Sequence, residues 1–319
     1  MALRHFLTLN DLSPAELDHV IARAIELKAE HRERRQSVQF PNYVLGMIFE
    51  KASTRTRISF EAGIAQFGGH AIFLSPRDTQ LGRGEPTEDS ARVISSMCDI
   101  VMIRTFEHSI IEKFAEYSSV PVINALTDDY HPCQLLADLL TVKEHKGDLA
   151  GLTMSYLGDS ANNMANSYLL AGVTAGMHVR IAGPEGYLPS ADIIAAAEDR
   201  AAETGGSVLV TVDAAEALLG ADVVATDTWV SMGQEDEKEA RLQLFRGYAV
   251  DEAAMKLAAP DAVVLHCLPA YRGYEIAAAV IDGPQSIVWD EAENRLHAQK
   301  ALMAWLMHRS GLAVVEGLD

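Results

Sequence analysis

A run of hydroxyl and guanidinium side chains, Ser53-Thr54-Arg55-Thr56-Arg57, is the most chemically suggestive stretch of the sequence. It follows the apolar run 44–49, which has the length of a strand, and precedes Phe60, Ile64 and Phe67 at helical spacing. A helix that begins here directs unpaired backbone N–H groups and the positive end of its dipole at an anion, and Arg can grip a phosphate through paired hydrogen bonds. A Ser/Thr helix cap beside two solvated arginines is the alternative.

Other polar side chains also follow apolar runs. Arg104 and His131 come at or just past the ends of two such runs in the first half, and Asp227 follows the run 223–226. Cys267 follows the run 262–266, and Asn163 comes six residues after the run 152–157. Each has an ordinary reading as well: Asp227 could cap a turn, Cys267 could be a small buried apolar residue, and Asn163 could cap a helix.

Strand and helix patterns alternate along the chain. The predicted strands are 44–49, 70–74, 100–104, 120–124, 152–157, 178–182, 208–212, 223–226, 262–266 and 286–289, with helices between them and a long terminal helix at about 291–308. Such alternation predicts an α/β fold of two similar doubly wound parallel sheets, whose ligands bind at the carboxyl ends of the strands. We expect the domain boundary near Gly147, giving domains 1–147 and 148–319.

Composition narrows the class of protein. A length of 319 residues suggests about two domains, and 49% hydrophobic residues suffice for two cores. The formal charge of −19 argues against nucleic acid or an anionic membrane as a partner. Cys98, Cys133 and Cys267 fit neither a zinc motif nor a disulfide framework. With no signal-peptide pattern and no long apolar run, a cytoplasmic protein is expected.

Several common catalytic motifs are missing from the sequence. Gly158-Asp159-Ser160 does not extend to a Gly-x-Ser-x-Gly elbow, and neither a dinucleotide-binding glycine motif nor a Walker motif occurs. The histidines are not spaced as two ligands on one helical turn. We therefore predict no metal and no cofactor.

Five motifs together resemble those of the aspartate and ornithine carbamoyltransferases. Residues 49–57 resemble the carbamoyl-phosphate loop of this family, and His131-Pro132-Cys133-Gln134 resembles its second signature. Residues 227–233 and His266-Cys267-Leu268-Pro269 are similar to the ornithine branch, as are residues 80–85. The resemblance spans essentially the whole chain. It implies transfer of the carbamoyl group of carbamoyl phosphate to the δ-amine of ornithine, giving citrulline and phosphate, in a cleft between the two domains.

The resemblance also implies roles at the carbamoyl-phosphate site. The phosphate would be held by Ser53, Thr54, Arg55, Thr56 and Arg295, with Gln80 reaching in from a neighbouring subunit of a homotrimer. Arg104 and His131 would donate hydrogen bonds to the carbamoyl oxygen as it becomes negative. The carbamoyl amino group would be bound by Gln134 and by the backbone carbonyls of Cys267 and Leu268.

Ornithine would bind second, held by Asn163, Asp227, Ser231 and Met232. Its δ-ammonium must lose a proton before it can attack, and a carboxylate or thiolate environment near Asp227 and Cys267 could tune that loss. The departing phosphate is another possible proton acceptor. The terminal helix at about 291–308 is expected to pack back on the first domain.

Two other classes of function remain open. A sister enzyme would transfer the carbamoyl group to aspartate, putrescine or an acylated ornithine, because the phosphate loop alone does not choose the acceptor. A non-catalytic protein would bind carbamoyl phosphate and never release phosphate. The ornithine-like motifs favour the ornithine reaction, and arginine biosynthesis is preferred over citrulline breakdown.

Overall fold

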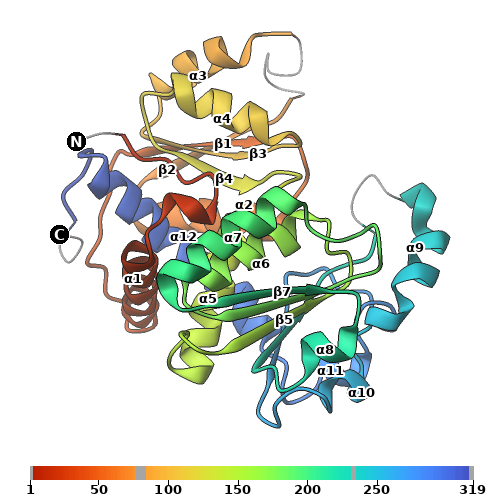
Figure 1. Cartoon of the computed structure of the whole chain (residues 1–319). Helices are drawn as coiled ribbons and strands as arrows, with labels where there is room; N and C mark the ends of the chain where they lie inside the picture. The colour runs from red at the N-terminus through yellow and green to blue at the C-terminus, as the bar shows by residue number, and fades with distance from the viewer. Residues whose placement is uncertain (1–2, 77–83, 231–234, 316–319) are drawn as a thin grey trace. The chain divides into compact units, whose positions relative to one another are not determined.

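The computed structural model describes residues 3–76, 84–230 and 235–315. The chain divides into two compact units: unit 1 comprises residues 1–137 and 294–319, and unit 2 comprises residues 138–293. Each unit is built on its own parallel sheet (Figure 1). Two helices begin in one unit and end in the other, namely α5 (Pro132–Lys146) and α12 (Val288–Arg309).

Unit 1 contains, among its described residues, a parallel four-stranded sheet in the order β2-β1-β3-β4. The strands are β1 (Val44–Phe49), β2 (His70–Leu74), β3 (Ile100–Arg104) and β4 (Val122–Leu126). Helices α3 (Thr87–Ser95) and α4 (His108–Tyr117) cover one face, where Ile103, Phe114 and Val122 share a core. Figure 1 places α2 (Thr54–Gln66) on the opposite face.

The strands of unit 1 differ in how far their side chains are exposed. The inner strands β1 and β3 are nearly continuous apolar runs and are buried almost throughout, as expected for strands covered on both faces. The edge strand β2 instead exposes Ile72 and Phe73, whose exposed fractions are 46% and 37%. Strands β1, β3 and β4 therefore supply the core, and the edge strand β2 leaves apolar surface uncovered in the single chain.

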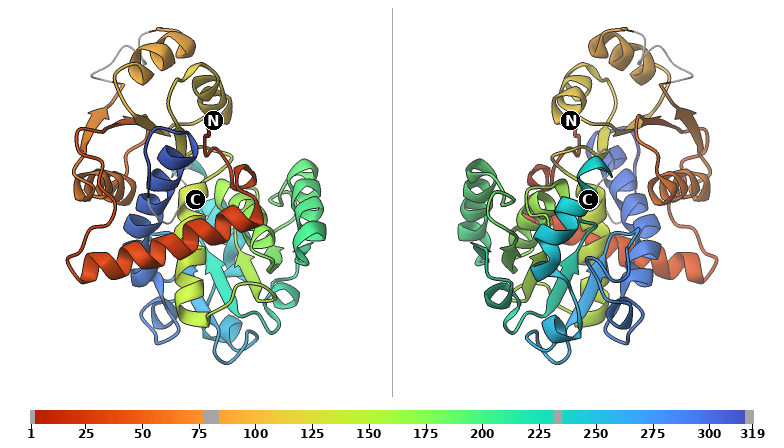
Figure 2. Two further views of the ribbon diagram at one scale, coloured as in Figure 1. Left: turned by 90° about the vertical axis from the view of Figure 1, so that its left-hand side faces the viewer. Right: turned by 90° about the vertical axis from the view of Figure 1, so that its right-hand side faces the viewer.

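Helix α1 (Pro14–Arg32) packs beside the part of α12 that belongs to unit 1 (Figure 2). The Lys28 ammonium donates a buried hydrogen bond of 2.8 Å to the Asn294 side-chain oxygen. Ser13 caps the start of α1 by accepting from the Glu16 N–H, and the Glu16 side chain accepts from the Ser13 N–H in return. The Ser-Pro-x-Glu pattern thus explains why α1 begins at Pro14.

Unit 2 contains, in its described part, a parallel five-stranded sheet in the order β7-β6-β5-β8-β9. The strands are β5 (Thr153–Leu157), β6 (His178–Ala182), β7 (Ser207–Thr211), β8 (Val223–Thr226) and β9 (Val263–His266). The helices are α6 (Asn163–Thr174), α7 (Ala191–Thr204), α8 (Ala214–Leu218), α9 (Lys238–Leu244), α10 (Glu252–Met255) and α11 (Ala278–Ile281). Short 3-10 helices lie at Glu235–Glu237 and Phe245–Tyr248 in unit 2 and at Leu9–Asp11 in unit 1.

The prediction of two parallel-sheet α/β units is confirmed. The prediction of a strand at 286–289 is wrong, because α12 already begins at Val288 and only Ser286 bridges to Val264. Asp290 and Glu291 in the first turn favour the helix start, since acidic side chains complement the helix dipole there. No helix in the described ranges is long and apolar enough to cross a bilayer.

Candidate active site

The hydroxyl and guanidinium stretch lies where β1 gives way to α2. Ser53 caps α2, because its side-chain oxygen accepts a hydrogen bond of 3.2 Å from the Thr56 N–H. The helix begins at Thr54 and therefore carries Thr54, Arg55 and Thr56 in its first turn. The end of β1 is held against β3 by a hydrogen bond of 2.9 Å from the Glu50 N–H to the Arg104 carbonyl. The predicted anion site thus has the expected form of a helix start at a strand end.

Arg104 and His131 occupy neighbouring positions at the same edge of the sheet. Arg104 is the last residue of β3 and pairs in register with Phe49, the last residue of β1. His131 immediately precedes Pro132, the first residue of α5. Both side chains are buried, with exposed fractions of 7% and 6%. Parallel strands bring their carboxyl ends together, which explains why residues distant in the sequence meet here.

Arg295 links the two motifs of unit 1. One of its terminal nitrogens donates 2.6 Å to the Gln134 side-chain oxygen, and the other donates 3.3 Å to the Thr56 hydroxyl. All three residues are buried, and Gln134 lies in the first turn of α5. The carbamoyl-phosphate motif, the second signature and the C-terminal arginine are therefore joined by hydrogen bonds within one unit.

The electrostatic surroundings keep His131 neutral. Burial lowers the pKa of His131 well below 6.5, and the positive charges of Arg295, Arg104 and Arg55 lower this pKa further. A neutral imidazole can still donate one N–H while adding no positive charge of its own. Cys133, in the first turn of α5, is buried, and burial raises the pKa of its thiol to about 12, so the thiol stays protonated at neutral pH.

In unit 2 a carboxylate and a thiol meet at two adjacent strand ends. Asp227 follows β8 and Cys267 follows β9, and the two strands are paired in register. The Cys267 thiol donates to an Asp227 carboxylate oxygen at 3.1 Å, and the Thr228 N–H donates to the same oxygen at 2.7 Å. Burial raises the pKa of Asp227, and burial together with the Asp227 charge raises the pKa of Cys267 well above its usual value. The group beside Asp227 is therefore a thiol, and the thiolate alternative raised from the sequence is not supported.

Asp227, His266 and Cys267 are also the residues among those described whose donor atoms could surround a metal ion, since these atoms lie within 4.8 Å of one another. Sequence spacing did not indicate this set, because its members come from two different strand ends. Both ring nitrogens of His266 are already engaged: Nδ1 accepts from the Leu268 N–H at 2.9 Å, and Nε2 lies 3.1 Å from Glu275. An ion could use His266 only by breaking one of these contacts.

The remaining predicted residues are placed as follows. Asn163 is the first residue of α6, whose cap is the neighbouring Asn162, and Leu268 is held through its N–H by His266. Gln80, Ser231 and Met232 lie outside the described residues. Predicted residues thus gather in one group in unit 1 and in a second group in unit 2.

A buried ion pair was missed by the sequence analysis. Arg241 of α9 pairs with Asp159, which follows β5, and its Nε donates 2.5 Å to the Trp229 carbonyl. Asp159 and Arg241 are 82 residues apart, and the pattern of α9 reads as an ordinary charged helix. Through these two contacts, Arg241 holds Trp229, which follows Asp227, close to Asp159, which follows β5.

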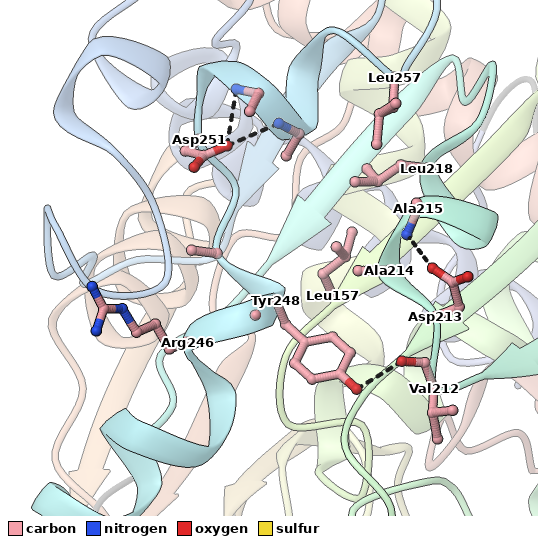
Figure 3. A pocket seen from close by; sticks show the side chains of 14 residues that line it. Leu157, Val212, Asp213, Ala214, Ala215, Leu218, Arg246, Tyr248, Asp251 and Leu257 are labelled. Carbon is pink, nitrogen blue, oxygen red and sulfur yellow. Dashed lines mark hydrogen bonds between the residues drawn. The ribbon is translucent and has the colours of Figure 1, made fainter.

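A pocket of about 880 Å³ in unit 2 lies apart from the group formed by Asp227 and Cys267 (Figure 3). It is lined mainly by small apolar residues of α8 and α10, together with Asp213, Arg246 and Tyr248. Asp213 and Asp251 cap these two helices, and the Tyr248 hydroxyl donates to the Val212 carbonyl at 2.8 Å. Of the predicted site residues within the described ranges, none lines this pocket.

The motifs and their geometry agree with comparisons to known proteins. The family model described as "Aspartate/ornithine carbamoyltransferase, carbamoyl-P binding domain" matches residues 4–144, and the model described as "Aspartate/ornithine carbamoyltransferase, Asp/Orn binding domain" matches residues 150–306. The ornithine carbamoyltransferase of Renibacterium salmoninarum is 62% identical over 309 residues, which are 96% of this chain and 99% of that protein.

Solved structures agree with the sequence relatives. The ornithine carbamoyltransferase of Pyrococcus furiosus superposes with a TM-score of 0.92 at 46% identity, covering 95% of this chain and 96% of that one. The anabolic ornithine carbamoyltransferase of Campylobacter jejuni gives a TM-score of 0.90 at 45% identity, covering 96% of this chain and 100% of that one. Since both family models match and together span most of the described fold, the chain belongs to the aspartate/ornithine carbamoyltransferase family.

Proposed function

We propose that this protein transfers the carbamoyl group of carbamoyl phosphate to the δ-amine of L-ornithine, giving L-citrulline and phosphate. The observation that carries the proposal is the cluster in unit 1, where Arg55, Arg104 and Arg295 surround a neutral His131 beside the start of α2. This cluster offers positive charge to a phosphate and neutral and charged donors to a carbonyl oxygen. The relatives reported above are named ornithine carbamoyltransferases, which is the reaction proposed here.

Carbamoyl phosphate binds first in this proposal. Its phosphate is held by the hydroxyls and N–H groups at the start of α2, by the guanidinium of Arg55 and by Arg295, through the residues Ser53, Thr54, Arg55 and Thr56. Arg295 is already oriented by Gln134 and Thr56, so part of the entropic cost of fixing its side chain is met before the anion arrives.

The carbamoyl carbonyl faces Arg104 and His131. When the amine attacks, this oxygen becomes negative, and donors fixed in a buried site stabilise the tetrahedral transition state. A neutral His131 donates through one ring N–H, and the charged Arg104 supplies the stronger hydrogen bond. Gln134 and the backbone carbonyls of Cys267 and Leu268 bind the carbamoyl amino group and so select the face that is presented.

Ornithine is held by Asn163, Asp227, Ser231 and Met232. Asp227 attracts an ammonium group of the substrate, and the Cys267 thiol, which donates to Asp227, fixes the carboxylate. The δ-ammonium loses one proton in the site, to a neighbouring carboxylate or to an oxygen of the bound phosphate group, and the free amine attacks the carbonyl carbon. As the C–O bond to phosphate breaks, the attacking nitrogen gives up its second proton to the departing phosphate. Cys267 forms no covalent intermediate, which agrees with the raised pKa of its thiol.

We further propose that the protein works in the cytoplasm, in arginine biosynthesis, as a homotrimer whose neighbouring subunit contributes Gln80. The exposed apolar side chains of β2 and of the adjoining α2, namely Ile58, Ile72 and Phe73, support burial of this region against another copy. Residues 1–147 would form the carbamoyl-phosphate-binding domain and residues 148–319 the ornithine-binding domain, with the helix at about 291–308 completing the first.

The test is citrulline formation by purified protein from carbamoyl phosphate and ornithine, with aspartate, putrescine and acetylornithine as parallel acceptors. We expect product with ornithine, in the form of citrulline, and no carbamoylated product with the other three acceptors. Arg55→Ala and Arg104→Ala should each lower kcat/KM about 10²–10³-fold, the usual effect of removing one donor to a developing oxyanion or an equivalent anion contact. Arg92→Ala is the matched control, because Arg92 is an exposed arginine of unit 1 paired with Asp89.

Other outcomes choose between the alternatives. Product from a different amine would retain the carbamoyl-phosphate site and overturn the assignment of Asn163, Asp227, Ser231 and Met232 to ornithine. Binding of carbamoyl phosphate without release of phosphate in the presence of any acceptor would identify a binding protein and overturn the enzymatic assignment.

A further inference from the structure

Gln299 lies one helical turn beyond Arg295 on α12 and is completely buried. With its amide oxygen directed at the guanidinium, it accepts from Arg295 Nε at 3.3 Å and from a terminal nitrogen at 2.9 Å. Its amide nitrogen then donates to the Arg295 carbonyl at 3.1 Å and to the Ser59 hydroxyl. In the opposite orientation the amide oxygen would face only acceptors and the amide nitrogen only donors. The hydrogen-bond network therefore assigns the orientation described here.

Ser59 carries the contact into the first turn of α2. Its hydroxyl lies 2.7 Å from the Arg55 carbonyl and 3.1 Å from the Thr56 carbonyl, to which it donates. A continuous series of hydrogen bonds therefore runs from the guanidinium of Arg295 through Gln299 and Ser59 to the backbone of the proposed phosphate loop. Each member of the series belongs to unit 1.

Small residues on α2 make this approach possible. Ser59 and Gly63 are four residues apart on α2, and they face Arg295, Gln299 and Met303, which are spaced by four on α12. A Cβ atom at Gly63 would lie 3.1 Å from Met303 and 3.2 Å from Lys300, closer than ordinary packing allows. The spacing of the two helices is thus set so that a short hydroxyl side chain can reach the Gln299 amide.

We propose that Gln299 is a positioning residue for carbamoyl-phosphate binding, which locks the guanidinium plane of Arg295 to the start of α2; the inference rests on the proposed function. The acceptors described above for Arg295 are amide and hydroxyl oxygens of Gln134, Thr56 and Gln299. These three oxygens orient the guanidinium and carry no formal charge themselves. A carboxylate at position 299 would hold the guanidinium equally well and would neutralise it.

This distinction gives the experiment two complementary variants. Gln299→Met keeps the length and volume of the side chain and removes both polar atoms. Gln299→Glu keeps acceptors for Arg295 and cancels its charge. Lys300→Met is the matched control, because Lys300 is the next residue of α12, is equally internal, and joins the same two helices through a hydrogen bond of 3.0 Å to Gln66 without contacting Arg295.

The readouts are KM for carbamoyl phosphate, KM for ornithine at saturating carbamoyl phosphate, kcat, the dissociation constant of inorganic phosphate by calorimetry, and the melting temperature. Gln299→Met should raise KM for carbamoyl phosphate and the dissociation constant of phosphate about ten-fold, the scale of a lost hydrogen bond to a charged group. Gln299→Glu should weaken phosphate binding at least as much while melting at or above the temperature of Gln299→Met. KM for ornithine should stay within about two-fold in both, because Gln299 acts on the anion site.

Lys300→Met should lower the melting temperature and leave both binding constants within about two-fold of the parent. The inference is overturned if Gln299→Glu binds phosphate as the parent does, or if Lys300→Met weakens phosphate binding as much as Gln299→Met. Ser59→Ala gives an independent check, and should weaken phosphate binding about three-fold through the loss of one neutral hydrogen bond.

Failure of the proposed function is distinguishable from failure of this inference. Absence of citrulline with the parent protein would overturn the function. The phosphate dissociation constants of the same variants would still decide whether Gln299 positions an anion-binding arginine.

Discussion

The ionisation of His297 is set by its surroundings at the level of a single side chain. The ring is fully buried and lies 5.7 Å from the ring of His31 between α1 and α12. Burial, followed by the charges of Lys28, Lys300, His31 and Arg32, together lower its pKa from 6.5 to about 3. The folded protein therefore holds this histidine neutral throughout the range in which an unfolded chain would protonate it.

This shift predicts a specific loss of stability in acid. Below pH 6.5 the unfolded chain binds a proton at this position and the folded chain does not, so the free energy of unfolding falls as pH drops from 6.5 toward about 3. Between pH 7.5 and pH 5 the contribution amounts to about 2 kcal/mol. The substitution His297→Phe removes the group that can bind this proton and keeps an aromatic ring beside His31.

Urea unfolding at the two pH values measures the effect. The parent should lose about 2 kcal/mol more than His297→Phe between pH 7.5 and pH 5. The other histidines contribute equally to both proteins, so the difference isolates His297. Identical pH dependence in the two proteins would contradict the assigned neutral state.

Residue types and their order in the sequence were enough to indicate the chemical groups of the candidate site. Ser53, Arg104 and Asp227 could be found because each follows or ends an apolar run, and parallel strands bring such ends together. The hydrogen bonds that join the residues of the candidate site to one another could not be found. Gln134 and Arg295 are 161 residues apart, and Gln299 reads as a polar residue in a helix. Its contact with Ser59 becomes visible only when α12 packs against α2.

At the scale of elements, the contact between α6 and β6 depends on a glycine. Gly172 lies within α6, where alanine would ordinarily be favoured by about 1 kcal/mol. A Cβ atom at this position would lie only 2.4 Å from a methyl group of Val179 on β6. Valine is stiff about χ1, so it cannot move aside cheaply. The clash should therefore outweigh the gain in helix propensity.

Gly172→Ala should lower the free energy of unfolding by about 1–3 kcal/mol, the usual cost of overpacking a core. Thermal or urea unfolding provides the measurement. Shortening the opposing side chain with Val179→Ala in the same chain should make Gly172→Ala less destabilising than it is alone. Equal cost in both backgrounds would show that the close approach to Val179 is not the cause.

Periodicity located most of the strands and the long helices and failed where a short apolar run has two readings. Ile287, Val288 and Trp289 have strand-forming side chains, which is why the sequence predicts a strand there. Val288 and Trp289 are instead the first residues of α12, whose length and acidic first turn favour a helix. The short helices α8, α10 and α11 span five residues or fewer, too few for a 3.6-residue period to be recognised.

At the scale of the whole molecule, the proposed trimer makes a prediction about mass. Ile72 is 46% exposed on the edge strand β2, and a second copy that covered it would bury apolar surface. Light scattering should give the parent a mass about three times the chain mass of 34.6 kDa. Ile72→Asp should shift the mass toward that of one chain and reduce citrulline formation, since Gln80 would no longer be supplied by a neighbour.

Leu219→Asp is the control for this experiment, because Leu219 is an apolar side chain of unit 2 with an exposed fraction of 67%. It should leave the mass unchanged. A parent protein with the mass of a single chain would contradict the trimer, and an Ile72→Asp protein that stays trimeric would place the interface elsewhere.

The split composition of unit 1 has a consequence during protein synthesis. Unit 2 is one uninterrupted stretch, whereas unit 1 needs residues 294–319, which the ribosome adds after the whole of unit 2. Domains fold as units while the chain emerges. Unit 2 therefore has all of its residues available for folding before unit 1 does. Arg295 and Gln299 are among these late residues. A nascent chain therefore acquires its complete anion-binding cluster only near the end of translation, and products released early would lack it.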